Sequence, residues 1–355
     1  METASLANYR YMGRSFSDGG DSSGAFSDCN SDRSGEFPSS AGSAPNGGAA
    51  LHRLLMSCAT DYSDEVVRGL ISDLESPSAP VETQLHAAMM LRLLAKHNPE
   101  NRLKIARAGA VRPLVALLSH PDPHLQEHGV TAILNLCLCD ENKDPIAAAG
   151  AIRPLVRALR TGTPAARENA AIALLRLSDV EEHKIAIGRS GAIPHLVHLL
   201  ETGGPRGKKD ASTALYSLCT TRENKNRAVK EGVMRPLLEL MADPESGMVD
   251  KAAYVLNSLV AVAEGRAAAV EEGGIPVLVE MVEVGTQRQK EIATLALRQI
   301  CEESVAYRAM VSREGAIPPL VALSQSGTTR AKNKAEELIE LLRQPRTAAR
   351  GREAD

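Results

Sequence analysis

The segment Gly150–Leu159 reads GAIRPLVRAL, and it decides the fold because its glycine and proline mark a helix boundary. Glycine is favoured just after the end of a helix, where the backbone often turns left-handed. Proline is costly inside a helix but is tolerated in the first turn, where its missing N–H breaks no hydrogen bond. We therefore predict that Gly150 ends one helix and that Pro154 lies in the first turn of the next.

The same phrase recurs along the chain at a nearly fixed period. Its glycines stand 41 residues apart, with a last step of 42, at Gly109, Gly150, Gly191, Gly232, Gly273 and Gly315. A period of about 40–47 residues with two or three helices per unit is typical of HEAT and armadillo solenoids. The sequence therefore predicts an all-α, right-handed superhelical solenoid with about 41 residues and three helices per repeat.

The third helix of each unit carries the clearest pattern. In the unit that follows Gly150, it is entered through Thr163-Pro164 and shows an apolar stripe at Ala170, Ala173, Leu174 and Leu177. This spacing places the stripe on one helix face. The first position of the stripe is small in every unit, at Gly129, Ala170, Ala211, Ala252 and Ala293. We expect neighbouring third helices to approach each other closely at this position.

Composition divides the chain into four parts. Residues 1–50 are rich in serine and glycine, and we expect a disordered tail because such a segment buries too little apolar surface to offset its ordering entropy. We expect a helical cap at residues 51–81, six repeat units at 82–344 and a loose tail at 345–355. Ser15, Ser17 and Ser34 are candidate phosphorylation sites. Phosphorylation would add nearly two negative charges at each.

Charge and motifs argue against several function classes. The net charge of −3 is no electrostatic footprint for nucleic acid. No apolar run reaches the roughly 20 residues that a membrane-spanning helix needs. The sequence has no recognisable catalytic or phosphate-binding motif. We therefore expect no enzyme activity, cofactor, small-molecule substrate or membrane insertion, and a location in the cytoplasm, the nucleus or both.

The cysteines and histidines do not indicate a metal site. Cys137, Cys219 and Cys301 are 82 residues apart, so they occupy one repeated position that we interpret as a small slot in the core. No CxxC pair is present, and His124 and His128, one helical turn apart, would need two more ligands nearby, which the sequence does not offer. We expect His124 and His128 to be surface residues, and the basic run Arg206–Lys209 to be a solvated loop and helix start.

The repeated phrases resemble armadillo repeats. GAIRPLV, the triplet EN[KR] before the first helix, and LSHPDPHLQEHGVTAILNLC at Leu118–Cys137 are similar to the repeat region of plant U-box ubiquitin ligases, over roughly residues 51–344. Residues 1–50 are too short and too polar for a U-box, so we expect the part that recruits a ubiquitin-conjugating enzyme to be absent. Importin-like armadillo proteins line their groove with tryptophan–asparagine pairs, whereas this chain has no tryptophan.

The resemblance implies that the third helices line a concave groove that contacts ligands. The second and sixth positions after the small residue lie opposite the core stripe, so we expect them to face this groove. With Arg92 from the first unit, these candidate residues are Arg92, Thr131, Asn135, Ile172, Arg176, Thr213, Ser217, Tyr254, Ser258, Leu295 and Gln299.

Two observations favour a binding role for this face. Ile172, Tyr254, Ile292 and Leu295 are apolar where the core stripe needs no apolar residue, which suggests a partner. Asn135, Ser217, Ser258 and Gln299 could satisfy the free N–H and C=O groups of an extended peptide. We expect alanine at Tyr254 or Asn135 to weaken binding with little change in stability.

These features favour a non-catalytic scaffold or adaptor that binds peptide segments or helices of other proteins. By resemblance, the setting is plant signalling or ubiquitin-linked regulation. One alternative is a component of a ubiquitin ligase whose catalytic recruitment is supplied elsewhere. A third hypothesis, nuclear import of basic cargo, is disfavoured by the positive charge of Arg176 at the centre of the groove.

Overall fold

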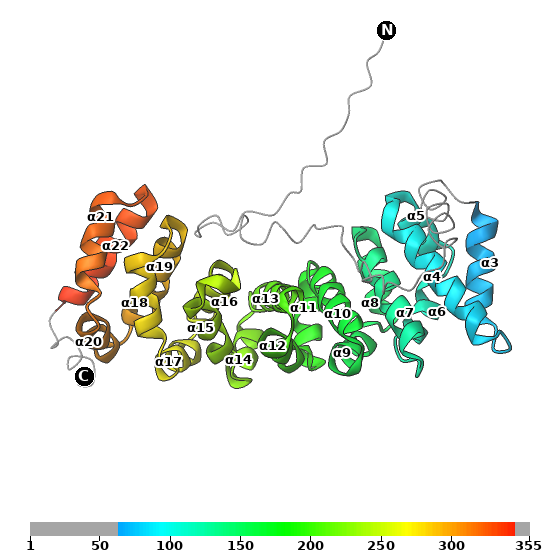
Figure 1. The fold of residues 1–355 in the computed structure, drawn as a ribbon, viewed down its shortest axis with the longest axis horizontal. Helices are drawn as coiled ribbons and strands as arrows, with labels where there is room; N and C mark the ends of the chain where they lie inside the picture. Colours follow the sequence, from blue (N-terminus) through cyan, green and yellow to red (C-terminus); the bar gives the residue numbers. More distant parts are fainter. Residues whose placement is uncertain (1–62, 345–355) are drawn as a thin grey trace, which may run out of the picture.

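The computed structural model describes residues 63–344, apart from the side chain of His97, and every regular element in this range is a helix. Its helices form one curved row (Figure 1). The row opens with the pair α3 (Asp64–Glu75) and α4 (Val81–His97). Six helical triplets follow, from Pro99 to Arg343. The boundary expected near residue 82 therefore lies at the start of α4, inside a unit.

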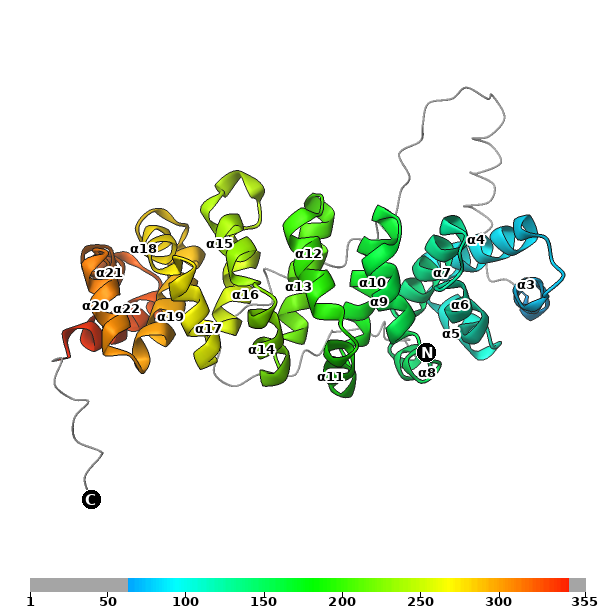
Figure 2. The same ribbon diagram turned by 90° about the horizontal axis from the view of Figure 1, so that it is seen from below.

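Each triplet consists of a first, a second and a third helix, and the helices of each kind repeat in corresponding positions along the row (Figures 1 and 2). The first helices are α5 (Pro99–Arg107), α8 (Lys143–Ala148, after the 3-10 turn η2 at Asp140–Asn142), α11 (Glu181–Arg189), α14 (Arg222–Lys230), α17 (Ala263–Glu271) and α20 (Val305–Arg313). The second helices are α6 (Val111–Leu117), α9 (Ile152–Thr161), α12 (Ala192–Thr202), α15 (Met234–Ala242, followed by η3 at Pro244–Ser246), α18 (Gly274–Val284) and α21 (Ile317–Ser326). The third helices are α7 (Pro123–Leu136), α10 (Pro164–Leu177), α13 (Pro205–Leu218), α16 (Val249–Leu259), α19 (Gln287–Glu302) and α22 (Thr329–Arg343).

The glycine–proline phrase is a joint between the first and second helices, as predicted. Gly150 has a φ of +83°, a left-handed conformation that glycine adopts without steric cost. A Cβ added there would meet no atom within 4 Å, so the backbone conformation, and not lack of space, selects glycine. Pro154 is the third residue of α9, where a missing N–H breaks no bond of the helix. The other five glycines of the phrase also have positive φ values.

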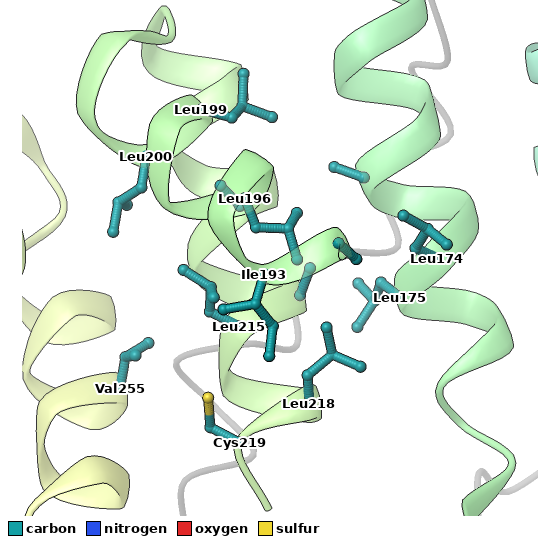
Figure 3. Packing of buried hydrophobic residues seen from close by; sticks show 14 of the residues in the cluster. Leu174, Leu175, Ile193, Leu196, Leu199, Leu200, Leu215, Leu218, Cys219 and Val255 are labelled. Atoms are coloured by element: carbon teal, nitrogen blue, oxygen red, sulfur yellow. The ribbon is translucent and has the colours of Figure 1, made fainter. Parts of the chain in front are cut away.

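The predicted stripe forms the core between neighbouring units. Ala170, Ala173, Leu174 and Leu177 are fully buried, and Figure 3 shows Leu215 and Leu218 of α13 packed beside Leu196 of α12. At the small position, a Cβ on Gly129 would lie 2.7 Å from the Cβ of Leu117, so α7 approaches α6, the second helix of its own unit, closely there. The close approach was expected between neighbouring third helices instead. Cys137, Cys219 and Cys301 are buried and free. Burial raises the pKa of each thiol to about 12, which keeps it protonated at neutral pH.

The EN[KR] triplet has a structural role in linking units. Its asparagines, Asn101, Asn142 and Asn224, are buried. The side-chain amide of Asn142 donates to Leu136 O at the end of α7 and to Arg102 O in α5, both at 3.1 Å. That of Asn224 donates in the same way to Leu218 O and Lys184 O, both at 3.0 Å. One amide thus ties together three helices from two units.

Several predictions fall on residues outside the described range. These are the disordered tail at 1–50, residues 51–62 of the cap at 51–81, the C-terminal tail at 345–355 and the phosphorylation sites Ser15, Ser17 and Ser34. All of them stay predictions.

Candidate partner-binding site

The third helices form one continuous layer. Each packs against the next, from α4 through α7, α10, α13, α16 and α19 to α22. Figure 1 shows the row bending into an arc, with α13, α16, α19 and α22 toward its inner side. We call the surface of this layer that faces away from the second helices the concave face. It carries the side chains that the sequence placed opposite the core stripe.

In the first units, the candidate side chains on α7 are buried, contrary to expectation. Asn135 is only 1% exposed, and its amide donates to Arg92 O at 2.9 Å. Thr131 is 3% exposed, donates to Glu127 O at 2.8 Å and accepts from Asn169 at 2.8 Å. Arg92 itself is half-buried, and burial lowers its pKa. These polar groups hold neighbouring units together, so alanine at Asn135 should affect stability as well as binding.

A chain of polar contacts continues along this layer from α7 to α13. Thr163 donates to a carboxylate oxygen of Glu127 at 2.5 Å, and Arg206 donates to Asn169 at 2.7 Å. Arg206 also lies 3.5 Å from carboxylate oxygens of both Glu168 and Asp210. Arg206, which starts the basic run, is therefore part of an inter-unit network and not a solvated loop residue.

Asp210 is the most perturbed carboxyl group in this network. Burial, together with the charge of Glu168, raises its pKa to about 7, while Arg206 opposes the shift. The unfolded chain binds fewer protons at this site than the folded chain between about pH 4 and 7. Asp210 therefore reduces the stability of the fold as the pH rises through that range.

The apolar candidates are less exposed than the sequence suggested. Ile292 is 6% exposed and belongs to the core, which corrects its assignment to the concave face. Ile172 and Tyr254 are half-buried and pack against the core, and Leu295 is half-buried as well. Thr213 is buried and donates to Lys209 O at 2.9 Å. No row of exposed apolar side chains results.

The candidates at the sixth position bond within the protein. Ser217 lies 2.8 Å from the hydroxyl of Ser178, and Ser258 donates to Cys219 O at 3.1 Å. The amide of Gln299 donates to Asn257 at 2.8 Å. All three candidates, and Arg176 on α10, are half-buried, so a partner could still reach them.

The structure adds a set of residues that sequence reasoning missed, at the fifth position after the small residue. This position is a buried leucine in the first units, Leu134 and Leu175. In the later units it holds the half-buried polar residues Tyr216, Asn257 and Arg298. This change from leucine to polar residues at one repeat position is a signal that the sequence did contain.

Tyr216 and Tyr254 form an aromatic pair across α13 and α16. Their ring centroids are 6.5 Å apart in an edge-to-face arrangement with an interplanar angle of 75°. Arg288 of α19 donates to the Tyr254 hydroxyl at 2.8 Å, and its guanidinium carbon lies 5.1 Å from the ring centroid. We call the following residues of α13, α16 and α19 the aromatic–polar strip: Tyr216, Tyr254, Asn257, Leu295 and Gln299.

The histidines of α7 lie in different surroundings. His124 is exposed, whereas His128 is half-buried, which corrects its assignment to the surface. Burial, reinforced by the charge of Arg92, lowers the pKa of His128 to about 4. Within residues 63–344, no three His, Cys, Asp or Glu side chains are grouped so that they could hold a metal ion. In the same range, no helix combines the length and hydropathy required to cross a bilayer.

The helical triplets and their packing define an armadillo-type solenoid, and solved structures support this class. An engineered protein superposes with a TM-score of 0.71 at 25% identity, covering 82% of this chain and 73% of that one. A computationally designed armadillo repeat protein for modular peptide recognition superposes with a TM-score of 0.50 at 20% identity, covering 78% and 99%.

The family is shown by sequence. The family model of the plant U-box protein ARM repeat region matches residues 67–349, so the chain belongs to this family. A segment of 59 residues is 58% identical to U-box domain-containing protein 13 of Arabidopsis thaliana, covering 17% of this chain and 9% of that protein. Another of 75 residues is 49% identical to the E3 ubiquitin-protein ligase SPL11 of Oryza sativa subsp. japonica, covering 21% and 10%. The matched segments span about a tenth of these relatives.

Proposed function

We propose that the concave face binds extended segments of other proteins. The chain then acts as a non-catalytic adaptor or scaffold in plant signalling or ubiquitin-linked regulation, in the cytoplasm, the nucleus or both. The observation that carries this proposal is the aromatic–polar strip on α13, α16 and α19. There the fifth position changes from buried leucine to half-buried polar residues, whose side chains a partner can reach.

The strip offers the two kinds of contact that an extended peptide needs. Tyr216 and Tyr254 present large amphipathic rings at a small cost in side-chain entropy. The amides of Asn257 and Gln299 use one bond for each other, and each amide group has further donor and acceptor sites. These sites can pair with the free N–H and C=O groups of a peptide backbone. The fold that the chain shares with the armadillo protein designed for peptide recognition is consistent with this role.

A selection experiment tests the proposal without a known partner. The full chain is used to select binders from a displayed library of random dodecapeptides, and the affinity of an enriched peptide is then measured. We expect Tyr254→Ala to weaken binding about tenfold or more, because truncating a central interface tyrosine commonly costs over 1 kcal/mol.

The matched control is Tyr307→Ala. Tyr307 is also half-buried and packed against the core, but it lies on α20, a first helix away from the concave face. We expect Tyr307→Ala to retain the wild-type affinity, with both variants folded by circular dichroism. A folded Tyr254→Ala protein that binds as tightly as wild type would overturn the proposal.

The relatives support a second candidate function, because one of them is an E3 ubiquitin-protein ligase. In this alternative the chain is part of a ligase whose catalytic recruitment is supplied elsewhere. An assay with the full chain, ubiquitin, activating and conjugating enzymes and ATP distinguishes the candidates. We expect no ubiquitin chains above the level without the protein. Chain synthesis that depends on the protein would reject the non-catalytic role.

A further inference from the structure

A pocket of about 670 Å³ lies between α9, α11 and α12, away from the concave face. Figure 1 shows α9 and α12 on the outer side of the arc. Its wall on α9 carries Arg153, Arg157 and Arg160, which are all exposed. They stand four and three residues apart, so they lie on one face of the helix. Three guanidinium groups therefore converge on one opening.

The positive charge of this pocket is largely uncompensated. Within residues 63–344, none of the three arginines of α9 forms an ion pair. Arg189, on the opposite wall, is paired with Glu223 at 3.0 and 3.2 Å. His195 also lines the pocket, and burial and the nearby charge of Arg160 lower its pKa, against a weaker opposing effect of Glu231. A guanidinium group can donate two parallel hydrogen bonds to a carboxylate or a phosphate. The pocket is therefore suited to a ligand that carries such negative groups.

The chain itself contains a segment of complementary charge. Ser15–Glu36 has five acidic residues and one arginine, so its net charge is −4, and it has seven serines. Three of these serines directly precede an aspartate, at Ser17, Ser27 and Ser31. Phosphorylation would add nearly two negative charges at each modified serine.

The distance along the chain suits an intramolecular contact. Between Glu36 and the start of the helical cap expected at residue 51 the chain is 15 residues long, which when fully extended can span about 50 Å. The second helix α6 packs against α3, and α9 is the second helix of the next unit. Packed helices lie about 10 Å apart, so the pocket is only a few helix diameters from α3. The segment can therefore reach the pocket, at the millimolar effective concentration typical of short linkers.

We propose that the pocket between α9, α11 and α12 binds the acidic segment Ser15–Glu36 of the same chain, and that serine phosphorylation in this segment strengthens the contact. The occupant is defined by its negative charge and by its tether to α3. The contact uses the outer side of the arc, so it is independent of peptide binding by the concave face.

Cys29 lies within the segment and permits a direct test in the full chain. Cys58 and Cys139 are replaced by serine, while Cys137, Cys219 and Cys301 are buried and resist labelling. A benzophenone attached to Cys29 is activated by light at low protein concentration, and mass spectrometry locates the cross-links. We expect them on α9, α11 and α12, and we expect about 0.5 M salt to reduce their yield, because exposed charges are then screened.

Charge reversal identifies the groups responsible. Arg153→Glu, Arg157→Glu and Arg160→Glu together should reduce cross-linking to the pocket at least severalfold. The matched control is Arg112→Glu with Arg235→Glu. These residues are exposed and occupy the position of Arg153 in two other units, and Arg235 is already paired with Glu239. Both proteins are first shown to be folded by circular dichroism.

Glutamate at Ser15, Ser17 and Ser34, added to the protein that carries the Cys58 and Cys139 replacements, should raise the cross-link yield severalfold. Cross-links spread evenly over the array, or confined to the concave face, would overturn the proposal. So would cross-links that join two chains, since the occupant would then be a second copy. A pocket that binds an added phosphopeptide of this sequence while Cys29 of the same chain fails to cross-link would also reject the intramolecular contact.

Discussion

Replacing Asn224 by alanine is expected to lower the free energy of unfolding by about 2–3 kcal/mol. Its side chain is fully buried, and its amide donates to Leu218 O and Lys184 O, both at 3.0 Å. A buried hydrogen bond contributes about 1 kcal/mol net, and truncation also leaves a cavity. Leu218 is the last residue of α13, where backbone carbonyls lack partners within the helix. The loss therefore falls on a junction between two units.

The free energies are measured by urea denaturation followed by circular dichroism. The matched control is Asn333→Ala, because Asn333 is exposed on α22. Alanine is the better helix former there, so we expect the control to change stability by less than about 1 kcal/mol. Equal unfolding midpoints for the two variants would show that the Asn224 amide does not link the units.

Two glycine-to-alanine substitutions should change stability in opposite directions. Gly265, in the first helix α17, stands 41 residues after Asn224 at the same repeat position. No side chain is present there to bridge the units, and the backbone of α17 packs directly on the end of α16. A Cβ on Gly265 would lie 2.0 Å from Leu259 O, a backbone atom that cannot rotate away. We expect Gly265→Ala to cost about 3 kcal/mol, as overpacking of a filled core does.

Gly69→Ala is the matched comparison. Gly69 lies within α3, is exposed, and an added Cβ would meet no atom within 4 Å. Alanine there should raise the free energy of unfolding by up to about 1 kcal/mol, the difference in helix propensity. Thermal unfolding of the two variants side by side checks both signs. A Gly265→Ala protein as stable as wild type would contradict the close approach of α17 to α16.

The fold was predictable because its decisive signals are local and repeated. A left-handed glycine such as Gly150 and a first-turn proline such as Pro154 fix a helix boundary without reference to the rest of the chain. Six copies in register then fix the period. The core stripe followed from the same counting, since positions such as Ala170 and Leu174 lie on one face of one helix.

The candidate site was less predictable because it depends on how neighbouring helices meet. Helical periodicity shows that Asn135 points away from the stripe of its own helix. It does not show that α4 lies close enough for Arg92 O to accept a hydrogen bond from it. Contacts with α4 and α10 bury Asn135 and Thr131, which bond to Arg92 O and Asn169. The change from leucine to Tyr216 and Asn257 at the fifth position is present in the sequence, but the exposure of these side chains follows only from the packing of neighbouring helices.

The most direct test of peptide binding by the concave face is to locate a bound peptide. A selected dodecapeptide carrying a benzophenone is cross-linked to the full chain, and the modified residues are identified by mass spectrometry. Cross-links on α13, α16 and α19, near Tyr254 and Leu295, are the predicted result. Cross-links confined to the second helices α9, α12 and α15 would contradict the proposed function.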